Sequence, residues 1–203
     1  MKTGPTVFVV DDDNAVRRFL EGLIASVGLR VMSCASAQEF FDAYETGMEG
    51  CILLDVRMPG TSGLEMQRML KEKAIDLPVI IITGHGDVQI AVHAMKAGAV
   101  DFIEKPFNNE LLLDRVQRTV EENLRMSTNR LSRSRILSRV ELLTPRERQV
   151  LDLVVSGNTN KGVARKLRIS ERTVEIHRAR LMDKMQANSL AELVKMAILL
   201  DGY

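Results

Sequence analysis

The chain has 203 residues, 45% of them hydrophobic, which is enough to bury one large core or two smaller ones. No window approaches the roughly 20 apolar residues that cross a bilayer, and two isolated cysteines argue against a disulfide framework or a zinc site. The net charge of +1 conceals an asymmetry: residues 1–118 carry 12 Lys+Arg and 17 Asp+Glu, whereas residues 119–203 carry 16 and 10. We therefore expect two cytoplasmic domains with no signal peptide and no membrane partner, the second attracted to a polyanion.

A strand followed by a helix recurs five times in the first half. The β-rich run 6–10 ends in four polar residues that can cap the amphipathic stretch 15–26. The pattern repeats at 30–34 with 36–44, 51–54 with 62–73, 77–82 with 87–96, and 100–104 with a helix from about 108. Five such units predict a parallel sheet wrapped by helices.

The apolar run 51–54 stops at a single carboxylate, Asp55, and then breaks at a Pro-Gly turn. Such a run is typical of a strand buried on both faces of a parallel sheet, where ligands bind just past the carboxyl ends. An aspartate here can also serve only to open a turn. The run alone leaves both interpretations open.

Polar residues follow four of the five expected strands: Asp11 and Asp12, then Asp55, Thr83 and Lys105. Each alone is compatible with a cap or a turn, but the carboxyl ends of parallel strands share one edge, so these residues meet. Three carboxylates suit Mg²⁺, which bridges to phosphoryl groups. An aspartate beside that cation can attack phosphorus, while the lysine offsets charge and the hydroxyl donates to the product.

These residues resemble the receiver domain of two-component response regulators over about residues 5–120. The motifs that carry the resemblance are Val-Val-Asp11-Asp12-Asp13, Leu-Leu-Asp55-Val-Arg-Met-Pro-Gly, Ile-Ile-Thr83-Gly-His-Gly and Lys105-Pro-Phe. The resemblance implies a flavodoxin-like fold with strand order 2-1-3-4-5.

The resemblance also implies the roles of individual residues. Asp55 is the expected phospho-acceptor, and Mg²⁺ is held by Asp11, Asp12 and Asp55 with the backbone carbonyl of Arg57.

Two further expectations concern signalling. Thr83 and Lys105 contact the phosphoryl group, and Phe102 is the switch aromatic that moves inward with Thr83. Without the resemblance, Phe102 would be interpreted as a core residue of the last strand.

Residues 121–141 have falling apolar density, with arginines alternating with serines and no Gly or Pro to end a helix. We expect a linker that is helical or a mobile arm, between a receiver at 1–120 and a second domain at 142–203.

Four helices are expected in the second half. A capping box at Thr144 and Glu147 opens the first, the second covers about 160–167, the third runs from a cap at Ser170 to about 185, and a second capping box at Ser189 and Glu192 opens the fourth. Two helices joined by a tight turn, the latter rich in arginine, indicate a helix-turn-helix within a small all-α four-helix domain.

The third helix has distinct faces at 100° per residue. Val174, Leu181 and Met185 point inward, whereas Arg172, Ile176 and Arg180 point outward with two more residues. Arginine suits guanine or phosphate and a small apolar group suits a thymine methyl in a major groove. An ordinary solvated face remains an alternative.

The second half resembles the LuxR-type DNA-binding domain over about residues 143–200, and the combination of halves is most similar to FixJ-like regulators. The motifs that carry the LuxR-type resemblance are Leu143-Thr-Pro-Arg-Glu-Arg-Gln-Val-Leu, Gly157, Asn160-Lys, Val163-Ala-Arg, Ile169-Ser-Glu-Arg-Thr-Val-Glu-Ile-His177 and Lys184-Met. The similarity to FixJ-like regulators rests also on Thr173-Val-Glu-Ile-His-Arg-Ala-Arg and Ala187-Asn-Ser-Leu. Glu175 and Ala179 stand where some relatives have lysines, so a lysine-based base readout does not carry over. The DNA-contact candidates are Lys161, Arg172, Thr173, Ile176, His177, Arg178 and Arg180.

The fourth helix carries an apolar stripe that can close the domain or pair two copies. The resemblance favours pairing on DNA through Leu190, Leu193, Val194 and Ala197.

The implied function is a transcription factor. A partner histidine kinase phosphorylates Asp55, and the protein then forms a homodimer on promoter DNA and acts on RNA polymerase as an activator. Two alternatives are a phosphatase with an aspartyl-phosphate intermediate and an architectural DNA binder with an inert first domain. The phosphatase lacks its general acid, because Arg57 stands where a second carboxylate is needed.

Overall fold

The computed structural model describes residues 4–84 and 88–200. The chain divides after Ser127 into two compact units. In the described part of the chain, no helix has the length and apolarity needed to cross a bilayer.

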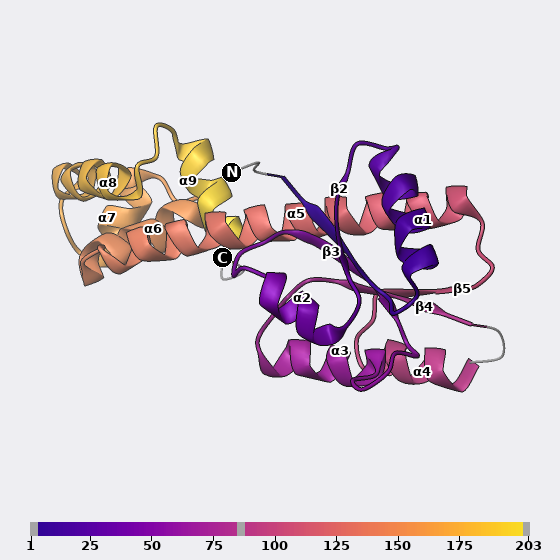
Figure 1. The fold of residues 1–203 in the computed structure, drawn as a ribbon. Coiled ribbons are helices and arrows are strands. Elements are labelled where there is room, and N and C mark those ends of the chain that lie inside the picture. Colours follow the sequence, from indigo (N-terminus) through magenta and orange to yellow (C-terminus); the bar gives the residue numbers. More distant parts are fainter. Residues whose placement is uncertain (1–3, 85–87, 201–203) are drawn as a thin grey trace. The chain divides into compact units, whose positions relative to one another are not determined.

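The first unit alternates strands and helices, as the sequence predicts (Figure 1). Its strands are β1 (Thr6–Val10), β2 (Arg30–Cys34), β3 (Gly50–Asp55), β4 (Val79–Thr83) and β5 (Asp101–Glu104). Its helices are α1 (Asn14–Ala25), α2 (Ala37–Ala43), α3 (Gly63–Glu72), α4 (Val88–Lys96) and the first part of α5 (Asn109–Glu141).

The five strands form one parallel sheet in the order β2-β1-β3-β4-β5, which confirms the predicted topology. β3 lies at the centre and all six of its residues are buried. β1 and β3 are paired so that Val10 lies opposite Leu54, which brings the residues after Val10 beside Asp55. The topology therefore puts the predicted polar residues of these strands next to one another.

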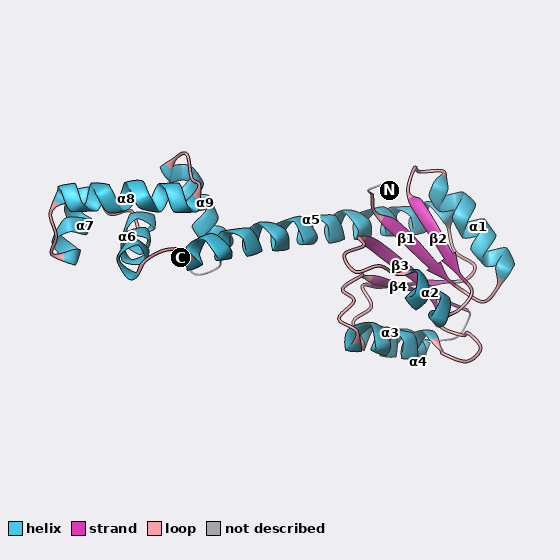
Figure 2. Cartoon of the chain, turned by 60° about the vertical axis from the view of Figure 1, so that its left-hand side comes forward, coloured by secondary structure: helices cyan, strands magenta, loops and turns pink. Residues whose placement is uncertain are grey.

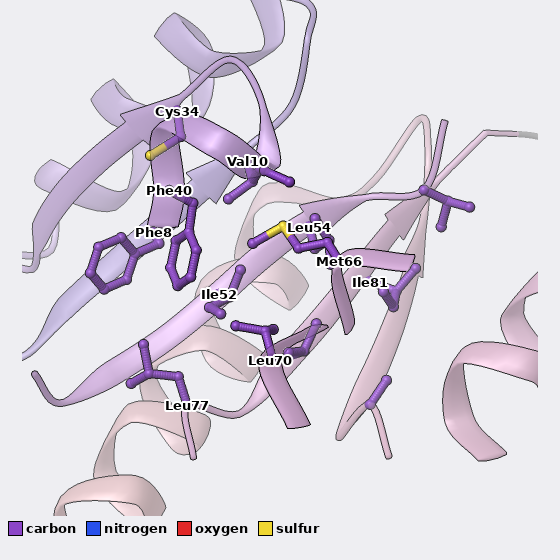
Figure 3. Close-up of a cluster of buried hydrophobic side chains, with 14 of the residues drawn as sticks. Phe8, Val10, Cys34, Phe40, Ile52, Leu54, Met66, Leu70, Leu77 and Ile81 are labelled. Carbon is purple, nitrogen blue, oxygen red and sulfur yellow. The ribbon is translucent and has the colours of Figure 1, made fainter. Parts of the chain in front are cut away.

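Two apolar layers enclose the sheet. Side chains from α2, α3 and α4 cover one face, and side chains from α1 and α5 cover the other. Figure 3 shows part of the first layer, where Phe40 from α2 lies against Phe8 from β1, with ring centroids 5.0 Å apart. Burial on both faces explains why these strands are nearly continuous runs of apolar residues.

Helix starts follow the predicted capping chemistry. Asp13 caps α1 by accepting a hydrogen bond from the backbone N–H of Ala15 at 2.8 Å. Thr144 and Glu147 form both arms of the predicted capping box at the start of α6. Satisfied N-terminal amides are the local reason why the helices begin where they do.

The second unit is all-α (Figure 2). It contains the end of α5 followed by α6 (Pro145–Val155), α7 (Asn160–Leu167), α8 (Glu171–Met185) and α9 (Leu190–Leu199). Its core includes Ile136 and Val140 of α5, both of which lie inside the stretch predicted to be a linker.

Candidate functional site

The carboxyl edge of the sheet brings Asp11, Asp55 and Lys105 together. Asp11 directly follows β1, Asp55 ends β3, and Lys105 directly follows β5. The Nζ atom of Lys105 donates to Asp11 Oδ2 at 2.7 Å and to Asp55 Oδ1 at 2.8 Å. One ammonium group thus bridges two carboxylates that are 2% and 7% exposed as residues.

The second oxygen of each carboxylate accepts a backbone hydrogen bond. Asp55 Oδ2 accepts from the N–H of Arg57 at 2.7 Å, and Asp11 Oδ1 accepts from the N–H of Asp13 at 2.8 Å. These bonds fix the orientation of both groups before any ligand binds.

The cluster contains two carboxylates and one ammonium group, and this imbalance of charge affects their pKa values. Burial raises the pKa of Asp55, and the negative charge of Asp11 adds to this increase, while hydrogen bonds from Lys105 and Arg57 oppose it. Burial alone would lower the pKa of Lys105, but its bonds to the two carboxylates raise it. Lysine therefore stays charged, while ionised Asp55 is less stable than an ordinary surface aspartate.

Thr83 and Phe102 lie on the same face of the sheet. Thr83 ends β4 and is 3% exposed, and its carbonyl accepts a hydrogen bond from the N–H of Lys105 at 2.7 Å. In β5, Phe102 pairs with Ile81, and its neighbour Ile103 points into the core. Phe102 itself is 47% exposed, so it is not a core residue of the strand.

The donor set of this edge fits Mg²⁺ through Asp11 and Asp55, because it offers carboxylate oxygens and a hard cation prefers oxygen ligands. Asp12 is exposed. Among residues 4–84 and 88–200, no group of three or more Asp, Glu, His or Cys residues is gathered closely enough to hold a metal ion. The structure thus brings together two of the three predicted carboxylates.

The helix-turn-helix of the second unit consists of α7 and α8. As predicted, Val174, Leu181 and Met185 of α8 are buried. Four of the DNA-contact candidates are exposed, namely Lys161, Arg172, Ile176 and Arg180.

The other three DNA-contact candidates are partly buried and have local roles. Thr173 lies 2.7 Å from the capping hydroxyl of Ser170, and Arg178 donates to Asn160 Oδ1 of α7 at 2.5 Å. The Nδ1 atom of His177 is buried and has no hydrogen-bond partner among the described residues.

Comparison with known proteins identifies both units. The family model of the response regulator receiver domain matches residues 7–117, and that of the luxR family of bacterial regulatory proteins matches residues 141–197. The chain is 47% identical over 193 residues to the transcriptional regulatory protein FixJ of Azorhizobium caulinodans, covering 95% of this chain and 92% of that protein. It is 43% identical over 198 residues to FixJ of Bradyrhizobium diazoefficiens, covering 98% and 97%. The chain is a FixJ-like response regulator.

Comparison with solved structures gives the same family. The response regulator StyR superposes with a TM-score of 0.81 at 40% identity, covering 99% of this chain and 100% of that one. Full-length FixJ from B. japonicum superposes with a TM-score of 0.63 at 42% identity, covering 100% of each chain. This regulator therefore combines a receiver with a LuxR-type DNA-binding domain and controls transcription, so it is not an enzyme. Its family implies a histidine kinase partner and Mg²⁺ at the phosphorylation site.

Several residues of the regulator's two sites could not be identified from sequence. In the receiver, Arg17 Nη1 donates to the carbonyl of Asp11 at 2.6 Å. A Cβ added to Gly63 would lie 2.2 Å from the carbonyl oxygen of Asp55, so only glycine lets α3 start this close to the site. In the sequence, the only signs that α3 begins close to Asp55 are the Pro-Gly turn and Ser62, a residue type that caps helices.

The DNA-binding domain of the regulator is held by contacts that the sequence did not reveal. Lys184 Nζ of α8 donates to buried Glu147 Oε2 at 2.7 Å. Arg139 of α5 donates to the carbonyl of Met185 at 3.1 Å, and Arg133 donates to the carbonyl of Leu200 at 3.3 Å. These arginines of the expected linker thus bind the carboxyl ends of α8 and α9, where cations are favoured.

In α9, two of the four residues that were predicted to pair with a second copy are buried. Leu193 and Ala197 are 1% and 2% exposed because they complete the domain's own core. They are therefore not available to a second copy. Of the predicted stripe, Leu190 is 46% exposed and Val194 is partly buried. Ile198, which was not predicted to pair, is 59% exposed.

Proposed function

We propose that Asp55 accepts a phosphoryl group from the partner histidine kinase. The observation that carries this proposal is the bridge from Lys105 Nζ to Asp11 and Asp55, because it joins a candidate nucleophile to a positive charge at one sheet edge. A carboxylate oxygen of Asp55 attacks phosphorus, and the bond from phosphorus to the kinase histidine breaks. Lys105 offsets the charge that develops on the phosphoryl oxygens.

Mg²⁺ is the proposed cofactor, held by the carboxylates of Asp11, Asp12 and Asp55 and by the carbonyl of Arg57. When bound, it neutralises charge on the transferring phosphoryl group. Asp12 is exposed and follows Asp11 directly in the sequence, so its side chain is free to turn toward the same site. Arg17 and the N–H of Asp13 keep Asp11 in place meanwhile.

Thr83 and Phe102 respond to the phosphoryl group that is added to Asp55. The Thr83 hydroxyl donates to the acyl phosphate, and Phe102 turns inward on the same face of the sheet. Phe102 is half-exposed, as are three other apolar side chains on or beside the same two elements. We call this set the α4-β5 patch: Val92 and Met95 of α4, Val100 directly before β5, and Phe102 of β5. We infer that this patch pairs two receivers after phosphorylation, since exposed apolar groups of this kind favour protein contacts.

The phosphorylated regulator then forms a homodimer on promoter DNA in the cytoplasm. Arg172, Ile176 and Arg180 are proposed to reach base edges or phosphates, because they are the exposed residues on one face of α8. Lys161 adds a phosphate contact from α7, while Thr173, His177 and Arg178 position the helix. On α9, Leu190 and Val194 pair the two copies, and the dimer acts on RNA polymerase as an activator.

A phosphodonor experiment tests this proposal. We expect acetyl phosphate with Mg²⁺ to give an acyl phosphate at Asp55 in mass spectrometry and a dimer in sedimentation. Asp55→Asn should give neither. Asp42→Asn, which changes an exposed carboxylate of α2, should behave like the wild type. An acyl phosphate that persists in Asp55→Asn would overturn the assignment.

A further inference from the structure

Gln67 of α3 is a buried polar residue that the phosphorylation site does not use. It is 3% exposed, and its neighbours Met66 and Leu70 belong to the apolar layer between the sheet and α3. Its Nε2 donates to the carbonyl of Ala94 in α4 at 3.1 Å. Its Oε1 is buried and has no hydrogen-bond partner among the described residues. A buried acceptor left unpaired costs about 1–3 kcal/mol, so stability alone does not explain an amide here.

Gln67 binds α4 at its carboxyl end. The same Ala94 carbonyl also accepts from the N–H of Ala99 at 3.0 Å, just past the end of the helix. One turn further along α3, Lys71 Nζ lies 3.3 Å from the position that a Cβ on Gly98 would take. An amide donor and an ammonium group of α3 therefore both approach the last turn of α4, where positive charge is favoured.

The amino end of α4 has a different connection. Thr83 ends β4 and α4 begins at Val88, so this end of the helix follows the switch threonine closely in the sequence. α4 also carries Val92 and Met95 of the α4-β5 patch, which are 46% and 40% exposed. A helix held at one end and displaced at the other turns about the held end.

We propose that Gln67 is a positioning residue that holds α4 by its carboxyl end, so that phosphorylation turns the helix about this end and rearranges the α4-β5 patch. The unpaired Oε1 destabilises the present position of α4 and so lowers the free energy needed to displace the helix. This inference rests on the proposed phosphorylation of Asp55.

Gln67→Met in the full chain tests it, because methionine has a similar volume but neither donates nor leaves a polar atom unpaired. Gln38→Met is the matched control, since Gln38 is an exposed glutamine of α2 whose Nε2 bonds Asp42 at 2.8 Å. We expect the ratio of dimerisation constants with and without acetyl phosphate to fall at least about fivefold in Gln67→Met, within the usual range of coupling between sites. Gln38→Met should keep the wild-type ratio.

Hydrogen exchange of peptides from 89–97 gives a second readout that needs no phosphodonor. We expect exchange in α4 to rise about tenfold in Gln67→Met, with the other helices unchanged and the thermal midpoint kept or raised. An unchanged exchange rate in α4 overturns the inference, whatever the phosphodonor does. Faster exchange in every helix with a lowered midpoint also overturns it, because Gln67 would then be a general packing residue. A wild type that never dimerises with phosphodonor contradicts the proposed function instead, and the exchange data still decide the role of Gln67.

Discussion

Each unit of the regulator contains a lysine bonded to a buried carboxylate, and the two clusters differ in their charge balance. In the receiver, Lys105 is shared between Asp11 and Asp55 at 2.7 and 2.8 Å. In the DNA-binding domain, Lys184 has one partner, Glu147, at 2.7 Å, and Glu147 also accepts a hydrogen bond from the N–H of Thr144.

The pKa values follow this difference. Burial, with the charge of Asp11, raises the pKa of Asp55. Burial would also raise the pKa of Glu147, but hydrogen bonds from Lys184 and Thr144 lower it to about 2. The receiver cluster therefore has one negative charge too many and can gain a cation, whereas the other cluster is complete and can only stabilise the fold.

The largest expected effect is on stability. Lys184→Met should destabilise the DNA-binding domain by about 3–5 kcal/mol, because it leaves Glu147 buried without its cation. Calorimetry should show a lower midpoint for this domain and an unchanged one for the receiver. Lys195→Met, at an exposed position of α9, is the control and should change little. A domain that melts like the wild type would mean that the ion pair is dispensable.

Acid should affect the same domain. The folded pKa of Glu147 is depressed from 4.5 to about 2, so its contribution is fully present above pH 4.5 and is lost as the pH falls toward about 2. The loss should amount to roughly 3 kcal/mol, which urea denaturation across this range can measure. Glu147→Gln should be less stable at neutral pH and should lack this pH dependence. A wild type whose acid dependence equals that of Glu147→Gln would contradict the assignment.

Only one of these two clusters could be predicted from the sequence. Asp11, Asp55 and Lys105 could be predicted to meet, because the carboxyl ends of parallel strands share an edge whatever the side chains do. The pair Glu147 and Lys184 could not, although the capping box containing Glu147 was predicted. Its formation depends on how α6 packs on α8, and helical periodicity gives only the buried face of each helix.

The same limit explains two differences in the second half. The stripe of α9 was predicted correctly as apolar, but periodicity does not tell whether Leu193 faces its own domain or a second copy. Likewise, Ile136 and Val140 are buried, but Leu131 and Leu137 of the same stretch are exposed, so its apolar residues do not mark one buried face by their spacing. Phosphorylation of Asp55 and the contacts of α8 with DNA stay predictions.

Lys105→Met should slow phosphorylation, and it should also cost the receiver some stability, because Asp11 and Asp55 then lose their shared cation. The rate of acyl-phosphate formation with acetyl phosphate should fall about 100-fold, since one charge that stabilises the transition state is lost. The receiver should still melt cooperatively, because Asp11 and Asp55 keep the hydrogen bonds that they accept from backbone N–H groups. Lys96→Met, at an exposed position of α4, is the control for the rate. A wild-type rate in Lys105→Met would remove this lysine from the mechanism.

The smallest effect should have the opposite sign. Because the folded pKa of Asp55 is raised, its contribution to stability is present below its ordinary pKa and is lost as the pH rises through the folded value. At neutral pH the ionised group therefore costs stability, and Asp55→Asn should stabilise the receiver by about 1 kcal/mol, measured by urea denaturation. Asp42→Asn should stay within about 0.5 kcal/mol of the wild type. Mg²⁺ should narrow the difference, since it stabilises by mass action only a receiver that binds it. A less stable Asp55→Asn receiver would mean that Lys105 already balances both carboxylates, and the surplus negative charge that we assign to this cluster would not exist.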